Sequence, residues 1–92
     1  MVDYVEYNGK KHPVKMAMLA LKGFEQETGK TIQDIGDDLH LHAVLLWHSI
    51  KVGYEFINKP FFKKDGDKEV PILTQRDCYW LLDEAFLKYY DI

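Results

Sequence analysis

The sequence contains one cysteine, Cys78, and has no apolar run near the length of a membrane span. A single thiol excludes an internal disulfide and a multi-cysteine metal site. Cys78 lies in a periodic apolar segment, which predicts a buried structural thiol rather than a nucleophile. Because the N-terminus has no basic-then-apolar leader, we expect a cytoplasmic protein without a membrane partner.

The sequence has no cluster of glycines and no excess of positive charge. The six glycines are scattered and form no phosphate-binding loop, and 12 Lys and Arg stand against 15 Asp and Glu, for a net charge of −3. A nucleic-acid-binding protein needs a basic stripe that neutralises phosphates. The charge pattern instead predicts a mixed, solvated surface and no nucleic-acid partner.

Metal-ligand spacing is also lacking. His40 and His42 are two positions apart, so on a helix their side chains point ~160° from one another and cannot share a metal. His48 falls in an apolar stripe, which is more typical of a hydrogen-bonded core or edge histidine than of a ligand. An EF-hand loop starting at Asp65 would need glycine and glutamate where Val70 and Arg76 stand. We therefore predict no metal site.

Nucleophilic catalysis finds no support either. Ser49 follows His48 directly, but neighbouring residues on a helix diverge by ~100° and do not form a nucleophile–base pair. The sequence predicts neither catalytic residues nor a cofactor, and an enzyme with a shallow polar site is the weakest of the functions considered.

The chain is 47% hydrophobic and 14% aromatic, which is enough to build one core in 92 residues. We expect a single domain over 1–92, mainly α (α+β), with a β-hairpin packed on three main helices and a short helical turn. Local signals place a hairpin at 1–16 with Asn8-Gly9 as its turn, a helix at 16–28 ended by Gly29, a short turn at 31–36, a central helix at 40–58, a loop at 59–73 and a C-terminal helix at 74–91. The loop has an alternative, a second hairpin with Asp65-Gly66 at its tip.

The central helix is apolar on two sides. A helix of this kind is buried between neighbours or shows one face to a partner. One stripe holds Leu41, Val44, Leu45, His48, Val52 and Phe56, and the other holds Ala43, Leu46, Ile50, Tyr54 and Ile57.

The C-terminal helix starts with Thr74 as its expected N-cap and Asp77 three residues later. Its core stripe contains Cys78, Leu81, Leu82, Ala85, Phe86 and Tyr89. Trp80 and Leu87, seven positions apart, face away from this stripe.

Tyr79, Tyr90 and Phe61-Phe62 add further apolar surface to that of Trp80 and Leu87, and two interpretations of these residues are open. They form either a second core contact or a protein–protein surface, because contiguous aromatic patches on small domains tend to mark interfaces. Should they belong to the core, the second stripe of the central helix offers the alternative surface, through Leu46, Ile50 and Tyr54.

The order of these pieces resembles the small tail assembly chaperones of long-tailed phages and prophages, over roughly residues 8 to 86. The resemblance is carried by the hairpin that runs into Pro13-Val14-Lys15-Met16, the segment Phe24-Glu25-Gln26-Glu27-Thr28-Gly29-Lys30-Thr31, the Leu-rich helix from Leu41 to Gly53, and Leu73-Thr74 leading into Leu81-Leu82-Asp83-Glu84. Tyr79-Trp80 and the long charged loop depart from the expected pattern.

The resemblance implies a non-enzymatic protein that binds tape measure and tail tube proteins during assembly, in the host cytoplasm. It also implies a homo-oligomer and absence from the mature virion. The alternative is a small regulatory or adaptor domain that binds one folded partner.

Overall fold

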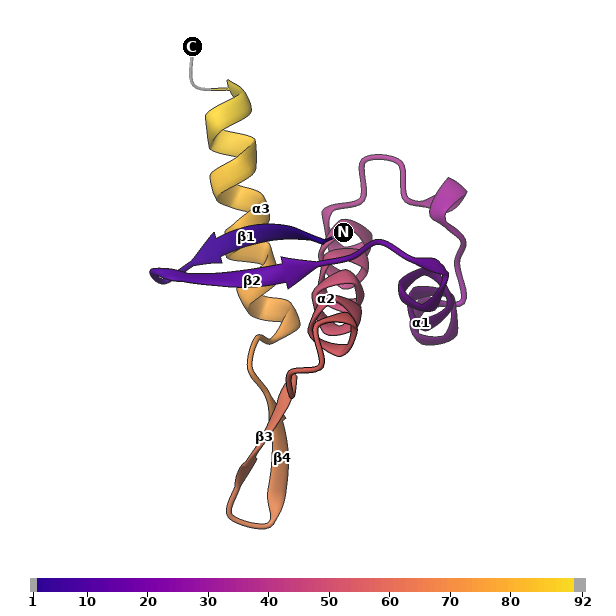
Figure 1. Cartoon of the computed structure of the whole chain (residues 1–92). Helices are drawn as coiled ribbons and strands as arrows, with labels where there is room; N and C mark the ends of the chain where they lie inside the picture. The colour runs from indigo at the N-terminus through magenta and orange to yellow at the C-terminus, as the bar shows by residue number, and fades with distance from the viewer. Residues whose placement is uncertain (1, 91–92) are drawn as a thin grey trace.

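The computed structural model describes the backbone of residues 2–90 and the side chains of residues 2–83. The fold is mixed α+β, with an N-terminal hairpin, three helices and a second short hairpin, as the sequence predicts apart from that second hairpin (Figure 1). In chain order the elements are β1 (Asp3–Tyr7), β2 (Lys10–Val14), α1 (Met18–Thr28), the 3-10 turn η1 (Ile32–Asp34), α2 (Leu39–Phe56), β3 (Phe62–Asp65), β4 (Lys68–Pro71) and α3 (Gln75–Tyr90).

The N-terminal hairpin forms because Asn8 and Gly9 both adopt positive φ, at 52° and 75°, as a tight two-residue turn requires. β1 and β2 are antiparallel, with Tyr4 opposite Pro13. Pro13 lies in a two-stranded sheet, where a residue that cannot donate a ladder hydrogen bond is tolerated. Past β2, the Lys15 N–H donates to the Ser49 carbonyl at 2.9 Å and ties the chain to α2.

α2 is the central helix, with α1 on one side and α3 on the other (Figure 1). It begins one residue earlier than expected, because Asp38 is its N-cap and accepts from the Leu41 N–H at 3.2 Å. It ends at Phe56, and Asn58 then turns the chain with a φ of 59°. Both apolar stripes of α2 are used within the chain.

One core cluster lies between α1 and α2, and includes Phe24, Ile35, Leu41, Val44 and Leu45. The other lies between α2, α3 and the base of the second hairpin, and includes Ala43, Ile50, Tyr54, Phe61, Leu73, Cys78 and Leu81. Phe56, which the sequence assigns to the first stripe, is instead 51% exposed.

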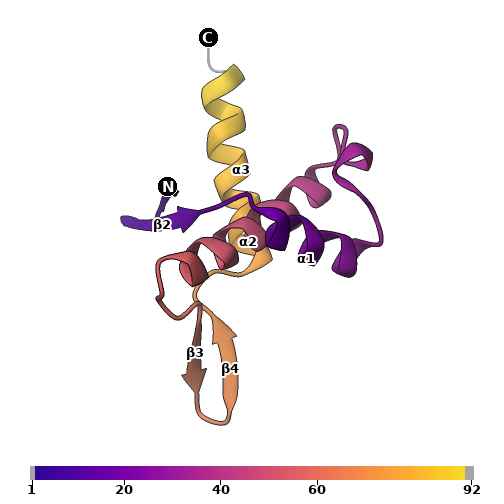
Figure 2. The same ribbon diagram turned by 45° about the vertical axis from the view of Figure 1, so that its right-hand side comes forward.

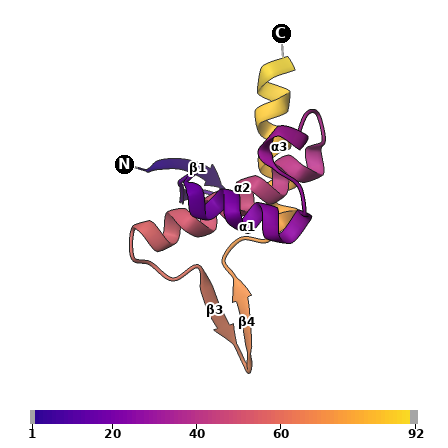
Figure 3. The same ribbon diagram turned by 90° about the vertical axis from the view of Figure 1, so that its right-hand side faces the viewer.

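The segment expected as a loop contains the alternative hairpin, β3–β4. Asp65 pairs with Lys68, so the turn residues are Gly66 and Asp67 rather than Asp65 and Gly66. Gly66 has a φ of 66° at the first turn position, where glycine carries no steric penalty. Seen from two further directions, this hairpin projects from the helices on one side, while the end of α3 extends on the other (Figures 2 and 3).

Candidate partner-binding surface

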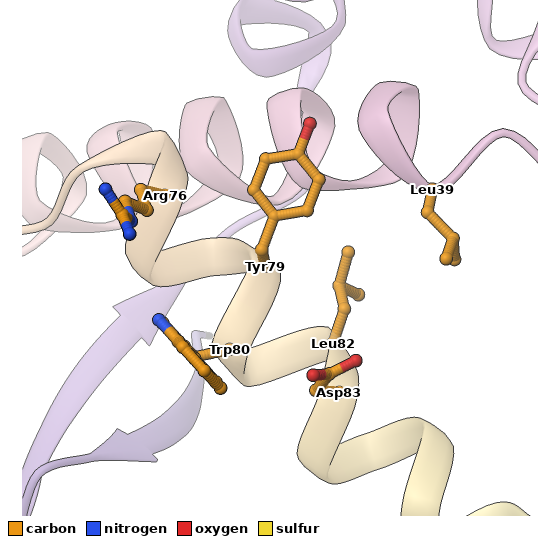
Figure 4. Close-up of a pocket in the computed structure, with 6 residues that line it drawn as sticks. All are labelled: Leu39, Arg76, Tyr79, Trp80, Leu82 and Asp83. Atoms are coloured by element: carbon orange, nitrogen blue, oxygen red, sulfur yellow. The ribbon is translucent and has the colours of Figure 1, made fainter.

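The first two turns of α3 and the start of α2 enclose a hollow of about 400 Å³ on the surface of the protein (Figure 4). Leu82 rises between Tyr79 and Leu39, and Trp80 stands on the outer side of α3 (Figure 4). We call this the α3 surface; it is lined by Leu39, Arg76, Tyr79, Trp80, Leu82 and Asp83.

A capping box marks the start of α3, the helix that supplies most of the residues lining this surface. Thr74 and Asp77 form a complete capping box: the Asp77 N–H donates to Thr74 Oγ1 at 3.1 Å, and the Thr74 N–H donates to Asp77 Oδ2 at 2.8 Å. In the first turns of the capped helix, Cys78 is buried and Trp80 is 57% exposed.

Tyr79 is held in place by α2. Its hydroxyl is hydrogen bonded to His40 Nδ1 at 2.5 Å, and the two rings are nearly parallel, with an interplanar angle of 19°. Tyr79 is 40% exposed and the neighbouring Leu39 is 52% exposed. A ring positioned before binding loses less conformational entropy when a partner covers it.

Two charged side chains flank the aromatic residues. Arg76 and Asp83 are seven positions apart on α3, so they lie on one face with Tyr79 and Trp80 between them. Tyr, Trp and Arg are the residue types that dominate binding energy at protein interfaces, and charged groups are typical of an interface rim. The arrangement therefore suits contact with another protein.

The alternative surface on α2 is buried within the chain. Ile50 is fully buried and Tyr54 is 4% exposed, while Leu46 is half-buried against the same core cluster. The chain around β3 and β4 covers this stripe, because Phe61 and Leu73 fold back onto it. The sequence placed Phe61 with the exposed aromatics, but it is 5% exposed.

The remaining predicted interface residues, Leu87 and Tyr90, lie outside the residues whose side chains the structure describes. Leu39, Arg76, Leu82 and Asp83 line the α3 surface but were not predicted to do so. Leu39 directly follows the Asp38 cap, so its position at a helix start was readable. Its closeness to α3 depends on helix packing and had no local signal.

Each histidine has a protein partner. The Tyr54 hydroxyl is hydrogen bonded to His12 Nδ1 at 2.6 Å, and His42 Nε2 donates to the Gly36 carbonyl at 2.9 Å. His48 Nε2 donates to Glu27 Oε1 at 2.8 Å, which confirms His48 as a hydrogen-bonded core histidine. Within residues 2–83, no group of three or more His, Cys, Asp or Glu side chains is arranged to hold a metal ion.

Burial raises the pKa of the Cys78 thiol to about 12, with the negative charge of Asp77 adding to the effect. The thiolate is the nucleophilic form of cysteine, so this thiol is inert at neutral pH. Cys78 is buried, as the sequence predicts.

In the described part of the chain, no helix combines the length and the apolar character needed to cross a membrane. Compared with protein-family models, curated proteins and solved structures, the chain shows no significant match to any of them.

Proposed function

We propose that this chain is a non-enzymatic assembly chaperone of phage or prophage tails, which binds tape measure and tail tube proteins through the α3 surface. The observation that carries the proposal is the cluster of exposed Leu39, Tyr79 and Trp80 around one hollow. Large apolar side chains that gather around a concavity are typical of a protein-binding site. The identity of the partners rests on the resemblance of the sequence to the small tail chaperones.

The proposed mechanism is holding rather than chemistry. A chaperone of this kind covers apolar surface on a partner that would otherwise associate too early, and releases it when the tail is built. Burial of Trp80 and Leu39 contributes about 25 cal/mol per Å² of apolar area, before the cost of association is subtracted. Such binding takes place in the host cytoplasm, and the chaperone is absent from the finished virion.

The test is co-expression of the tagged chain with the products of its neighbouring genes, among which the proposal expects a tape measure protein and a tail tube protein. We expect one or both to co-purify with the wild type, and the double variant Leu39→Ser with Trp80→Ser to lose them. The matched control is Tyr4→Ser, because Tyr4 is a similarly exposed aromatic residue on β1.

Each outcome has a clear meaning. A wild-type protein that recovers neither tail protein contradicts the chaperone proposal, and recovery of one unrelated folded protein instead supports the adaptor alternative. If the double variant retains the tail proteins, the binding surface lies elsewhere. The melting temperature of each variant confirms that the fold is intact.

A further inference from the structure

The two charged side chains of the α3 surface are free to meet groups outside the chain. Arg76 and Asp83 are both exposed. Within residues 2–83, neither side chain takes part in an ion pair or a hydrogen bond. Seven positions on a helix also separate them by about 10 Å along its axis. Each charge therefore remains available to a partner.

The order of the side chains along α3 makes this surface complementary to itself. Arg76 lies three positions before Tyr79, and Asp83 lies three positions after Trp80. A two-fold axis that crosses α3 between Tyr79 and Trp80 exchanges the two charged ends. Arg76 of each copy would then lie opposite Asp83 of the other, since a two-fold axis repeats every contact in reverse.

The same charges select the direction of the pair. With two copies of α3 parallel and in register, Arg76 would lie against Arg76 and Asp83 against Asp83, and both contacts would repel. The antiparallel pair has an ion pair at each end instead. Because exposed ion pairs add little affinity, these contacts set the direction of the helices, and the apolar residues between them supply most of the binding energy.

The apolar middle of the surface lies on the side of α3 that the core does not use. Cys78 and Leu81 turn toward the core and are 0% and 8% exposed, whereas Tyr79 and Trp80 are 40% and 57% exposed. Figure 4 shows Trp80 on the outer side of the helix. At ~100° per residue, Arg76, Trp80 and Asp83 fall within one arc of about 60°. A second copy can cover this arc without disturbing the core.

We infer that two copies of the chain pair through their α3 surfaces, with the helices antiparallel about an axis between Tyr79 and Trp80. A tail protein then reaches the surface only by displacing the second copy, a consequence that rests on the proposed function. Self-association and partner binding compete by mass action. The pairing thus keeps the exposed aromatic residues covered until a partner takes the place of the second copy.

The test measures the dimer dissociation constant of the full chain by sedimentation over a dilution series. Arg76→Glu and Asp83→Arg should each weaken the dimer by at least about tenfold, because each change opposes like charges at both ends of the pair. The matched control is Lys64→Glu, a charge reversal at an exposed position of β3, which should leave the constant unchanged.

The double variant Arg76→Glu with Asp83→Arg is the decisive measurement. It restores opposite charges across the antiparallel pair and keeps the net charge of −3. We expect its dissociation constant to return to within a few-fold of the wild-type value. Both positions are exposed, so all variants should melt at the wild-type temperature when compared at a dilution that separates the copies.

Three results would overturn the inference: a wild-type chain that stays monomeric at about 1 mM, a dimer that neither single reversal weakens, or a double variant no tighter than the single ones. The proposed function is tested separately, by recovery of tail proteins. A monomeric chain that recovers them contradicts the pairing alone, and a dimer that recovers none contradicts the chaperone proposal alone.

Discussion

At the start of α3, the carboxylate of Asp77 is hydrogen bonded on both of its oxygens. The Tyr7 hydroxyl donates to Oδ1 at 2.9 Å, and the Thr74 N–H and hydroxyl donate to Oδ2 at 2.8 and 3.0 Å. A residue that caps its own helix thereby also fastens the N-terminal hairpin to that helix. The hydrogen bonds between Thr74 and Asp77 could be predicted from the spacing of these two residues. The hydrogen bond from Tyr7 could not, because it joins residues 70 positions apart in the sequence.

Replacement of Thr74 by Ala should lower the free energy of unfolding by about 1 kcal/mol, the usual effect of losing such a cap. The change removes the hydroxyl that accepts from the Asp77 N–H. Urea denaturation measures the effect, and Thr74→Ser, which keeps the hydroxyl, is the matched control. An unchanged urea midpoint for Thr74→Ala would mean that the helix does not depend on this cap.

Acid should destabilise the fold through Asp77. Burial acts to raise the pKa of Asp77, but hydrogen bonds from the Thr74 backbone, the Tyr7 hydroxyl and the Thr74 hydroxyl outweigh it and lower the pKa. A folded-state pKa below the unfolded value of about 3.9 gives stability that is present above pH ~4 and lost as the pH falls through the folded-state pKa.

The Asp77→Asn variant tests this dependence, because asparagine keeps an acceptor for the cap but does not titrate. Between about pH 6 and about pH 3, a range that spans the ordinary pKa values of carboxyl groups, its free energy of unfolding should fall less than that of the wild type. The pKa values of Glu27 and Asp34 are also lowered, so some acid sensitivity should remain. Equal losses in both proteins would contradict the role of Asp77.

At the scale of elements, the hairpin and α2 touch through a glycine. A Cβ at Gly53 would lie 2.4 Å from the Pro13 carbonyl oxygen and 2.9 Å from the Val14 nitrogen. Backbone atoms of β2 therefore rest directly on the helix, and Lys15 anchors the chain just beyond this point through the Ser49 carbonyl. A glycine inside a helix is unfavourable by itself, by about 1 kcal/mol relative to alanine, so the close approach explains its presence.

Gly53→Ala should lower the free energy of unfolding by about 1–3 kcal/mol, the range typical of overpacking, despite the better helix propensity of alanine. Gly23→Ala is the comparison, since the atoms nearest to an added Cβ there belong to the His48 side chain, which can move more readily than backbone. We expect the smaller loss for Gly23→Ala in thermal or urea unfolding. A Gly53→Ala protein as stable as the wild type would show that β2 can shift without loss.

At the scale of the whole molecule, α2 separates the two core clusters. Its inner positions should therefore be far more sensitive than the exposed aromatics. Ile50→Ala should lower the free energy of unfolding by about 2–5 kcal/mol, a large part of the total for a domain of this size. Trp80→Ser should leave the melting temperature nearly unchanged, and a collapse of that variant would place Trp80 in the core instead.

Much of the fold was predictable because its signals are local. The Asn8-Gly9 turn, the Gly29 helix end and the Thr74 cap each depend on the backbone preferences of a few neighbouring residues, and the apolar period of α2 follows from helix geometry. The hairpin at 62–71 was predicted only as an alternative to a loop, because its strands are short and mainly polar and most of their residues are exposed.

Only the tertiary structure decided which apolar faces are covered. The sequence showed two stripes on α2 and an aromatic group on α3, but it could not show that Phe61 and Leu73 cover Ile50 and Tyr54. Likewise, His40 and Tyr79 meet across 39 positions and create the α3 surface. Burial of this kind depends on contacts between distant segments, and no local preference encodes which of several apolar faces finds a partner within the chain.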